Sequence, residues 1–147
     1  MRRKTILLTA DIAYAGNAAG WDAVIYSKAI AVTSQDFNQV VESNDLVFVD
    51  FWATWCGPCR AFGPTFEKAS EANPDIYFAK VDIDQNPDLA SAAKVQAVPT
   101  LMVIKNQQIV FQQAGALRAS DLDDLIAQAK ELDVNAAAAE EATEQAQ

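Results

Sequence analysis

The run Leu46–Phe51 limits the folds open to this chain more than any other segment. Five of its six side chains are apolar, and most of these are β-branched or aromatic. Because apolar and polar side chains do not alternate, the run predicts a strand that is buried on both faces of a sheet. Such a strand needs a layer of structure above and below it. Asp50 is the single polar residue in the run.

The segments around this run predict strands and helices in the order βαβαβαββα. The predicted strands are Ala29–Val32, Leu46–Phe51, Ile76–Val81, Thr100–Ile104 and Ile109–Phe111, the last two forming an antiparallel hairpin around Lys105–Gln108. The predicted helices are one capped by Thr33 or Ser34, Cys59–Ala72, Pro87–Lys94, and one capped by Ser120. Pro64 inside the second helix predicts a kink or a break. This order favours the α/β class, with a central mixed β-sheet flanked by helices on both faces.

The ends of the chain differ in composition from the middle. Residues 1–27 carry the basic start Arg2–Lys4 and a short apolar stretch that Asp11 interrupts. A secretory signal has a longer apolar region, so we expect a retained extension, with export as the lesser alternative. Its apolar side chains predict packing on the domain or pairing at a sheet edge. Residues 133–147 are rich in Ala, Glu and Gln and predict a solvated, acidic, disordered tail. One domain then spans residues 28–132.

Charge and residue usage exclude several function classes. The chain has 11 Lys and Arg against 20 Asp and Glu, a formal net charge of -9. Such a chain repels a phosphate backbone, so we expect no nucleic-acid partner. No apolar run approaches the roughly 18 residues of a membrane span, so we expect no membrane partner. The chain has no His, which excludes imidazole metal ligands and His general bases. We expect a monomer in the cytoplasm.

The chemistry is concentrated in Trp55-Cys56-Gly57-Pro58-Cys59, which follows the buried strand. A thiol at a helix N-terminus receives backbone N–H groups and the positive end of the helix dipole, which favour the thiolate. Cys56 at the exposed helix start is therefore the candidate nucleophile. Gly57 and Pro58 make the turn, and Cys59 inside it is the candidate resolving thiol. A zinc site or a purely structural disulfide is a weaker alternative, because two more ligands are missing and the loop is short.

Together with the segments around it, this motif resembles the thioredoxin family over residues 28–132. The matching segments are Val49–Ala53, Trp55–Cys59, Pro64, Ala79–Val81, Asp84–Pro87, Val98–Thr100 and Gly115–Leu117. The resemblance implies a three-layer thioredoxin-like sandwich and a protein-disulfide reductase. It implies thioredoxin reductase and disulfide-containing proteins as partners. It further implies that NADPH is used only through the reductase, and that the redox-active disulfide Cys56–Cys59 takes the place of a bound cofactor or metal.

The resemblance also assigns roles around the cysteines. Asp50 takes the Cys59 proton through water, which suits a carboxyl whose pKa burial raises and Lys80 partly lowers. A buried ion pair without a catalytic role is the alternative for Asp50. Trp52 packs beneath the active-site turn. The substrate-docking residues are Trp55, Val98, Gly115 and Pro99 in the cis form.

One departure and two rival functions accompany this interpretation. The hairpin has Asn106-Gln107 where the family often has Asn-Gly, and Gln at positive φ is strained, which leaves the turn type open.

The rival functions are a binding or chaperone-like subunit without turnover, and an exported disulfide oxidoreductase. The sequence leaves the physiological targets open, and also the choice between NADPH and ferredoxin as electron source.

Overall fold

The computed structural model describes residues 29–135 of the chain. The predictions for the extension at 1–27, and for the tail beyond residue 135, lie outside these residues. The described elements, in chain order, are β1 (Ile30–Ala31), α2 (Phe37–Ser43), β2 (Leu46–Trp52), α3 (Gly57–Ala72), β3 (Tyr77–Asp82), α4 (Pro87–Ala92), β4 (Thr100–Lys105), β5 (Gln108–Ala114) and α5 (Ala119–Glu131).

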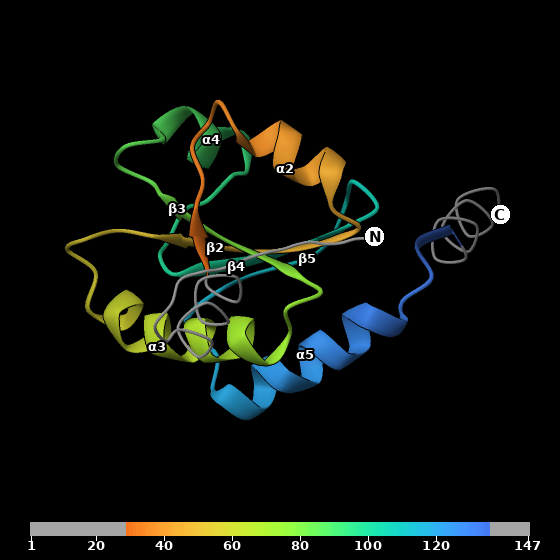
Figure 1. Cartoon of the computed structure of the whole chain (residues 1–147). Coiled ribbons are helices and arrows are strands. Elements are labelled where there is room, and N and C mark those ends of the chain that lie inside the picture. The colour runs from red at the N-terminus through yellow and green to blue at the C-terminus, as the bar shows by residue number, and fades with distance from the viewer. Residues whose placement is uncertain (1–28, 136–147) are drawn as a thin grey trace, which may run out of the picture.

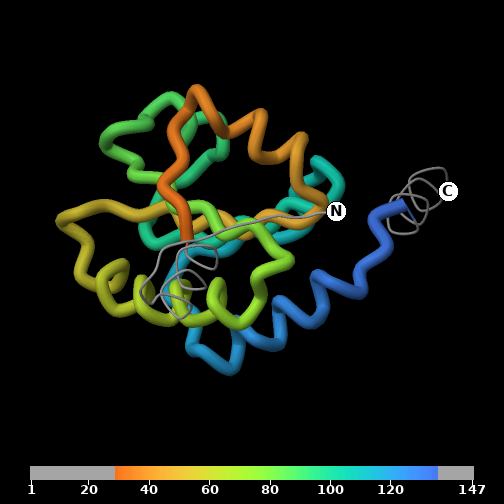
Figure 2. Tube along the Cα trace, in the orientation of Figure 1, coloured from red at the N-terminus to blue at the C-terminus, as the bar shows by residue number. Residues whose placement is uncertain are grey.

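The five strands form one mixed sheet in the order β1-β3-β2-β4-β5. Strand β2 is central, parallel to β3 and antiparallel to β4. Helices α2 and α4 cover one face of the sheet, and α3 and α5 cover the other (Figure 1). The predicted three-layer α/β fold is therefore confirmed. The Cα trace in Figure 2 shows the connection from β2 to α3 at one end of the sheet.

Alternate side chains of β2 serve two separate cores. Phe48 packs with residues of α3 and α5, whereas Val47, Val49 and Phe51 pack on the side of α2 and α4. All four are fully buried. On the α3 side, Phe48 and Phe78 stack with ring centroids 5.4 Å apart. Because strand side chains alternate between faces, Asp50 lies on the same face as Phe48. The fold thus places a carboxyl beneath α3.

Helix α3 begins two residues earlier than predicted and passes through Pro64 without ending. Cys56 is its N-cap, and the helix continues to Ala72. The predicted break is wrong because Pro64 lies on the exposed side of α3, where the Arg60 carbonyl that loses its helical donor can bond to water. On the opposite side Phe62 and Phe66 are buried, and their packing holds the helix together.

Two predicted helix caps are also wrong. Helix α2 begins at Phe37 with Asp36 as N-cap, because Thr33 belongs to a preceding turn in which its carbonyl accepts from both of these N–H groups. Helix α5 begins at Ala119 with Arg118 as N-cap and no side-chain capping bond. Ser120 is therefore inside α5. Buried Leu122 and Ile126 fix the position of this helix more strongly than a cap does.

The C-terminal end of α5 is held by a lysine from the sheet. Lys105 Nζ donates to the carbonyl oxygens of Ala129 and Lys130, at 2.6 and 2.9 Å. A cation satisfies these unpaired carbonyls and opposes the negative end of the helix dipole. Beyond the helix, Val134 is 4% exposed. Packing therefore reaches at least one residue of the segment predicted as a solvated tail. Among residues 29–135, no helix has the length and apolar character of a membrane span.

The β4–β5 hairpin keeps a two-residue turn despite its Gln. Asn106 and Gln107 have φ of 49° and 68°, as a type I′ turn requires. The Asn106 N–H donates to the Asp45 carbonyl at 2.8 Å, which anchors the turn. In β5, Ile109 pairs with Ile104 and Phe111 pairs with Val103, so the ladder skips a residue and forms a bulge. Gln107 in this turn adopts the left-handed conformation, which is strained for a residue that has a Cβ.

Gln107→Gly should raise the free energy of unfolding by roughly 0.5–1 kcal/mol, because glycine adopts positive φ without a steric cost. Gln108→Gly is the matched control. Gln108 begins β5, where glycine weakens a strand. Urea denaturation of both variants measures the difference. A Gln107→Gly variant no more stable than the wild type would show that the turn is unstrained.

Candidate dithiol active site

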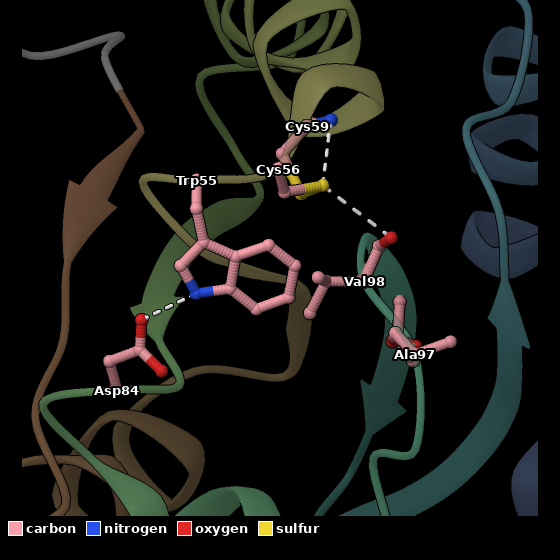
Figure 3. The surroundings of a disulfide bond; sticks show 7 residues. Trp55, Cys56, Cys59, Asp84, Ala97 and Val98 are labelled. Atoms are coloured by element: carbon pink, nitrogen blue, oxygen red, sulfur yellow. Dashed lines mark hydrogen bonds between the residues drawn. A yellow bond between two sulfur atoms is a disulfide. The ribbon is translucent and has the colours of Figure 1, made fainter.

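The two cysteines lie where β2 gives way to α3, and they are bonded to each other. Cys56 and Cys59 form a disulfide with their Cα atoms 5.3 Å apart (Figure 3). The Cys56 N–H donates to the carbonyl of buried Ala53 at 3.2 Å, which fixes the turn at the end of β2. Exposed Gly57 and Pro58 form the first turn of α3. The predicted pairing of the cysteines is therefore present.

The Cys56 sulfur is the side-chain cap of α3. The Cys59 N–H donates to Cys56 Sγ at 3.1 Å, so one of the unpaired donors of the helix N-terminus points at this sulfur. After reduction the same bond and the helix dipole favour a thiolate at Cys56. The prediction that Cys56 is exposed is wrong, since Cys56 and Cys59 are 4% and 5% exposed. The hydrogen bond distinguishes the two sulfurs, and exposure does not.

The loop before β4 brings a backbone edge to the disulfide. The Val98–Pro99 peptide bond is cis, as the resemblance implied. Cys56 Sγ lies 3.5 Å from the Val98 carbonyl oxygen, which can accept a hydrogen bond from a thiol at Cys56. The Gly115 N–H donates to the Pro99 carbonyl at 2.8 Å. Gly115 has a φ of +106° with open space where a Cβ would lie, so backbone conformation is what requires glycine there.

Trp55 lies on the surface beside the disulfide and is held there by an acid. Its side chain is 64% exposed, and its indole Nε1 donates to Asp84 Oδ2 at 2.8 Å (Figure 3). The Asp84 N–H in turn donates to Asp82 Oδ1 at 2.9 Å. Sequence reasoning gave Asp84 no role. Its position in a matching segment was a signal, but the spacing of 29 residues concealed the contact.

Asp50 is buried beneath the cysteines without a hydrogen-bond partner. It is 1% exposed, and neither carboxylate oxygen has a partner among the residues described. Burial raises the pKa of Asp50 to about 7, and the positive charge of Lys80 partly opposes this. An open cavity of about 360 Å³ is lined by both Asp50 and Cys59. Asp50 and Cys59 therefore border the same open space.

Lys80 is opposite Asp50 in the ladder but does not pair with it. Asp50 and Lys80 are register partners on β2 and β3. Half-buried Trp52 packs against the cysteine cluster, as predicted, and Lys80 Nζ lies 5.2 Å from the centroid of its ring. A contact ion pair between Asp50 and Lys80, the alternative left by the sequence, does not describe this arrangement. No three Cys, Asp or Glu side chains within residues 29–135 are grouped to hold a metal ion.

Comparison with known proteins identifies the family. The thioredoxin family model matches residues 28–128. The chain belongs to the thioredoxin family. A protein of Streptomyces coelicolor that carries the name thioredoxin 2 is 46% identical over 121 residues, 82% of this chain and 90% of its own length. Thioredoxin-1 of Saccharomyces cerevisiae is 43% identical over 84 residues, 57% of this chain and 82% of its own.

Solved thioredoxin structures agree with this assignment. A mutant thioredoxin from Halobacterium salinarum superposes with a TM-score of 0.68 at 36% identity, over 73% of this chain and 95% of that one. Oxidised mitochondrial thioredoxin 3 of Saccharomyces cerevisiae gives 0.64 at 35% identity, over 70% and 97%. This thioredoxin-family chain is accordingly a thiol-disulfide oxidoreductase with protein-disulfide reductase activity.

Asp50→Asn should raise stability at neutral pH and leave it nearly unchanged near pH 4. The folded carboxyl holds its proton up to about pH 7, whereas the ordinary pKa of this group is 3.8. Between these values the folded state binds more protons, so wild-type stability falls as pH rises through this window. Asn removes a cost on the order of a few kcal/mol above pH 7.

Denaturant unfolding at pH 4 and pH 8 measures this difference. Asp124→Asn, at an exposed position of α5, is the control and should change stability little at either pH. An equal gain from Asp50→Asn at both pH values would contradict the titration.

Proposed function

We propose that this chain reduces disulfides in other proteins through Cys56, and that a thioredoxin reductase restores the dithiol with electrons from NADPH. The observation that carries the proposal is the hydrogen bond from the Cys59 N–H to Cys56 Sγ at the start of α3. It favours Cys56 as the attacking thiolate, because a backbone N–H that points at a sulfur stabilises its ionised form. In this proposal the chain is an electron carrier between the reductase and its target proteins.

The reaction is two successive thiol–disulfide exchanges. In the first, the Cys56 thiolate attacks one sulfur of a target disulfide, forms a mixed disulfide and releases the other target sulfur as a thiolate. In the second, the Cys59 thiolate attacks Cys56 Sγ, closes the Cys56–Cys59 bond and releases the remaining target sulfur. The target gains two electrons and the dithiol loses two.

Asp50 serves the second exchange by taking the Cys59 proton. Both groups line the same cavity, so a water molecule between them provides a path for the proton. A carboxyl with a pKa of about 7 is half ionised near neutral pH, which suits a general base. Lys80 modulates this basicity through its charge.

The target docks as an extended segment beside the cysteines. The Val98 carbonyl lies next to Cys56 Sγ, and the Gly115–Pro99 contact fixes the neighbouring backbone. Backbone groups at such an edge can pair with an extended chain irrespective of its side chains. Exposed Trp55 adds an apolar surface beside the disulfide. This arrangement supports broad specificity for disulfide-containing proteins.

The setting proposed for this activity is the cytoplasm, with the protein as a monomer. A reducing role needs a compartment where a reductase keeps the thiols reduced. Full-length protein with thioredoxin reductase, NADPH and a disulfide-containing protein tests the function directly. Oxidation of NADPH that depends on both the chain and the disulfide protein is expected. A chain that binds disulfide proteins without oxidising NADPH would instead be a binding subunit.

Cys59→Ser should trap covalent complexes with target proteins, whereas Cys56→Ser should trap almost none. Without the second thiol, the mixed disulfide at Cys56 has no internal attacker and persists. Non-reducing electrophoresis of each variant after incubation with oxidised target protein gives the readout. Trapping by Cys56→Ser in place of Cys59→Ser would reverse the two roles.

A further inference from the structure

Three side chains of the site occupy one face of two neighbouring strands. Asp50 and Trp52 are two residues apart on β2, so they share a face. Lys80 on β3 is the register partner of Asp50. All three line the cavity that also contains Cys59. The Lys80 ammonium can therefore lie near the Asp50 carboxylate or over the Trp52 ring, and in the structure it lies over the ring.

We propose that Trp52 is a positioning residue whose indole face holds the Lys80 ammonium away from Asp50, so that this carboxyl stays out of an ion pair. The inference rests on the proposed role of Asp50 as proton acceptor and names the residue that tunes it. Lys80 Nζ is 5.2 Å from the ring centroid, within the distance at which a cation is attracted to an aromatic face. Both Asp50 oxygens lack a hydrogen-bond partner among the residues described.

An ion pair would impair the proposed chemistry. An ammonium in contact with a buried carboxylate favours its charged form strongly, because the surroundings screen the attraction weakly. Asp50 would then stay ionised well below neutral pH and would be a poor base for the Cys59 thiol. The direction of its titration agrees with separation of the charges, since burial outweighs the attraction of Lys80.

The other charged groups around Asp50 do not replace Lys80 in this role. From α3, the cavity is lined by Cys59, by exposed Arg60 and by half-buried Glu67. On the other side, the register partner of Asp50 on β4 is Leu101, which carries no charge. Lys80 is the cation directly opposite Asp50 in the ladder. Its placement therefore has the largest effect on the carboxyl.

The test is the titration of Asp50 in the oxidised full-length protein, followed by the carbon NMR signal of its carboxyl group. Asp50→Asn assigns the signal by its disappearance. Trp52→Leu should move the Asp50 midpoint down by about one pH unit, because Lys80 is then free to pair with Asp50. Trp52→Phe, which keeps an aromatic face, should restore most of the wild-type midpoint.

The same substitution also admits water, which would lower the midpoint without involving Lys80. A double-mutant cycle separates the two effects. In a Lys80→Met background, Trp52→Leu should lower the Asp50 midpoint much less than in the wild-type background, because only the effect of water remains. A downward shift of equal size in both backgrounds would overturn the proposal, and so would the absence of any shift in Trp52→Leu alone.

A measurement on the wild type keeps the proposal testable if Trp52→Leu does not fold. Protons beside the Lys80 ammonium should show an upfield ring-current shift, and ordinary lysine shifts would overturn the proposal. Disulfide-reduction rates against pH distinguish the two proposals from each other. A midpoint that moves as expected while the pH profile of reduction stays fixed would support the role of Trp52 and refute Asp50 as proton acceptor.

Discussion

The burial of β2 on both faces is the constraint on which the rest of the structure depends. Its alternate side chains hold two cores together, with Phe48 facing α3 and Val49 facing α2. Asp50 interrupts this apolar strand beside a cavity that residues of α3 also line. A carboxyl in this position loses hydration, and its altered titration is a direct result of the strand's central place in the sheet. The seven residues of β2 therefore contribute both to the packing of the two cores and to the titration of Asp50.

The active site gathers three chain segments at one end of the sheet. The first is the β2–α3 turn with Cys56, the second is the loop ending at Pro99, and the third is the end of β5 at Gly115. The antiparallel neighbours β2, β4 and β5 bring these segments together, since the end of β2 lies beside the start of β4, which in turn lies beside the end of β5. Each segment contributes a backbone group: the Cys59 N–H, the Val98 carbonyl and the Gly115 N–H. Most of the contacts around the disulfide are therefore made by the backbone.

The sequence predicted those features of the fold and the site that depend on local residue patterns and on short motifs. The apolar run of β2, the order of the elements and the pairing of Cys56 with Cys59 follow from such signals. It failed at helix ends and at Pro64, where buried side chains on one face of a helix outweigh local preferences. It also gave no contact between Trp55 and Asp84, and no placement of Lys80 over Trp52. Those contacts depend on how neighbouring strands and loops meet, which the spacing of residues along the chain does not specify.

The bulge in β5 concerns the association of separate copies of this protein at high concentration. Strand β5 is the outer strand on one side of the sheet, and its seven residues carry no charge. Uncharged outer strands are templates on which the backbone of a second molecule can add and extend the sheet into an aggregate. The pairing of Val103 with Phe111 and of Ile104 with Ile109 leaves Val110 without a place in the ladder. The strand bends there and its twist increases. A bulge is one of the features that discourage such pairing at an outer strand, as exposed lysines do on other strands.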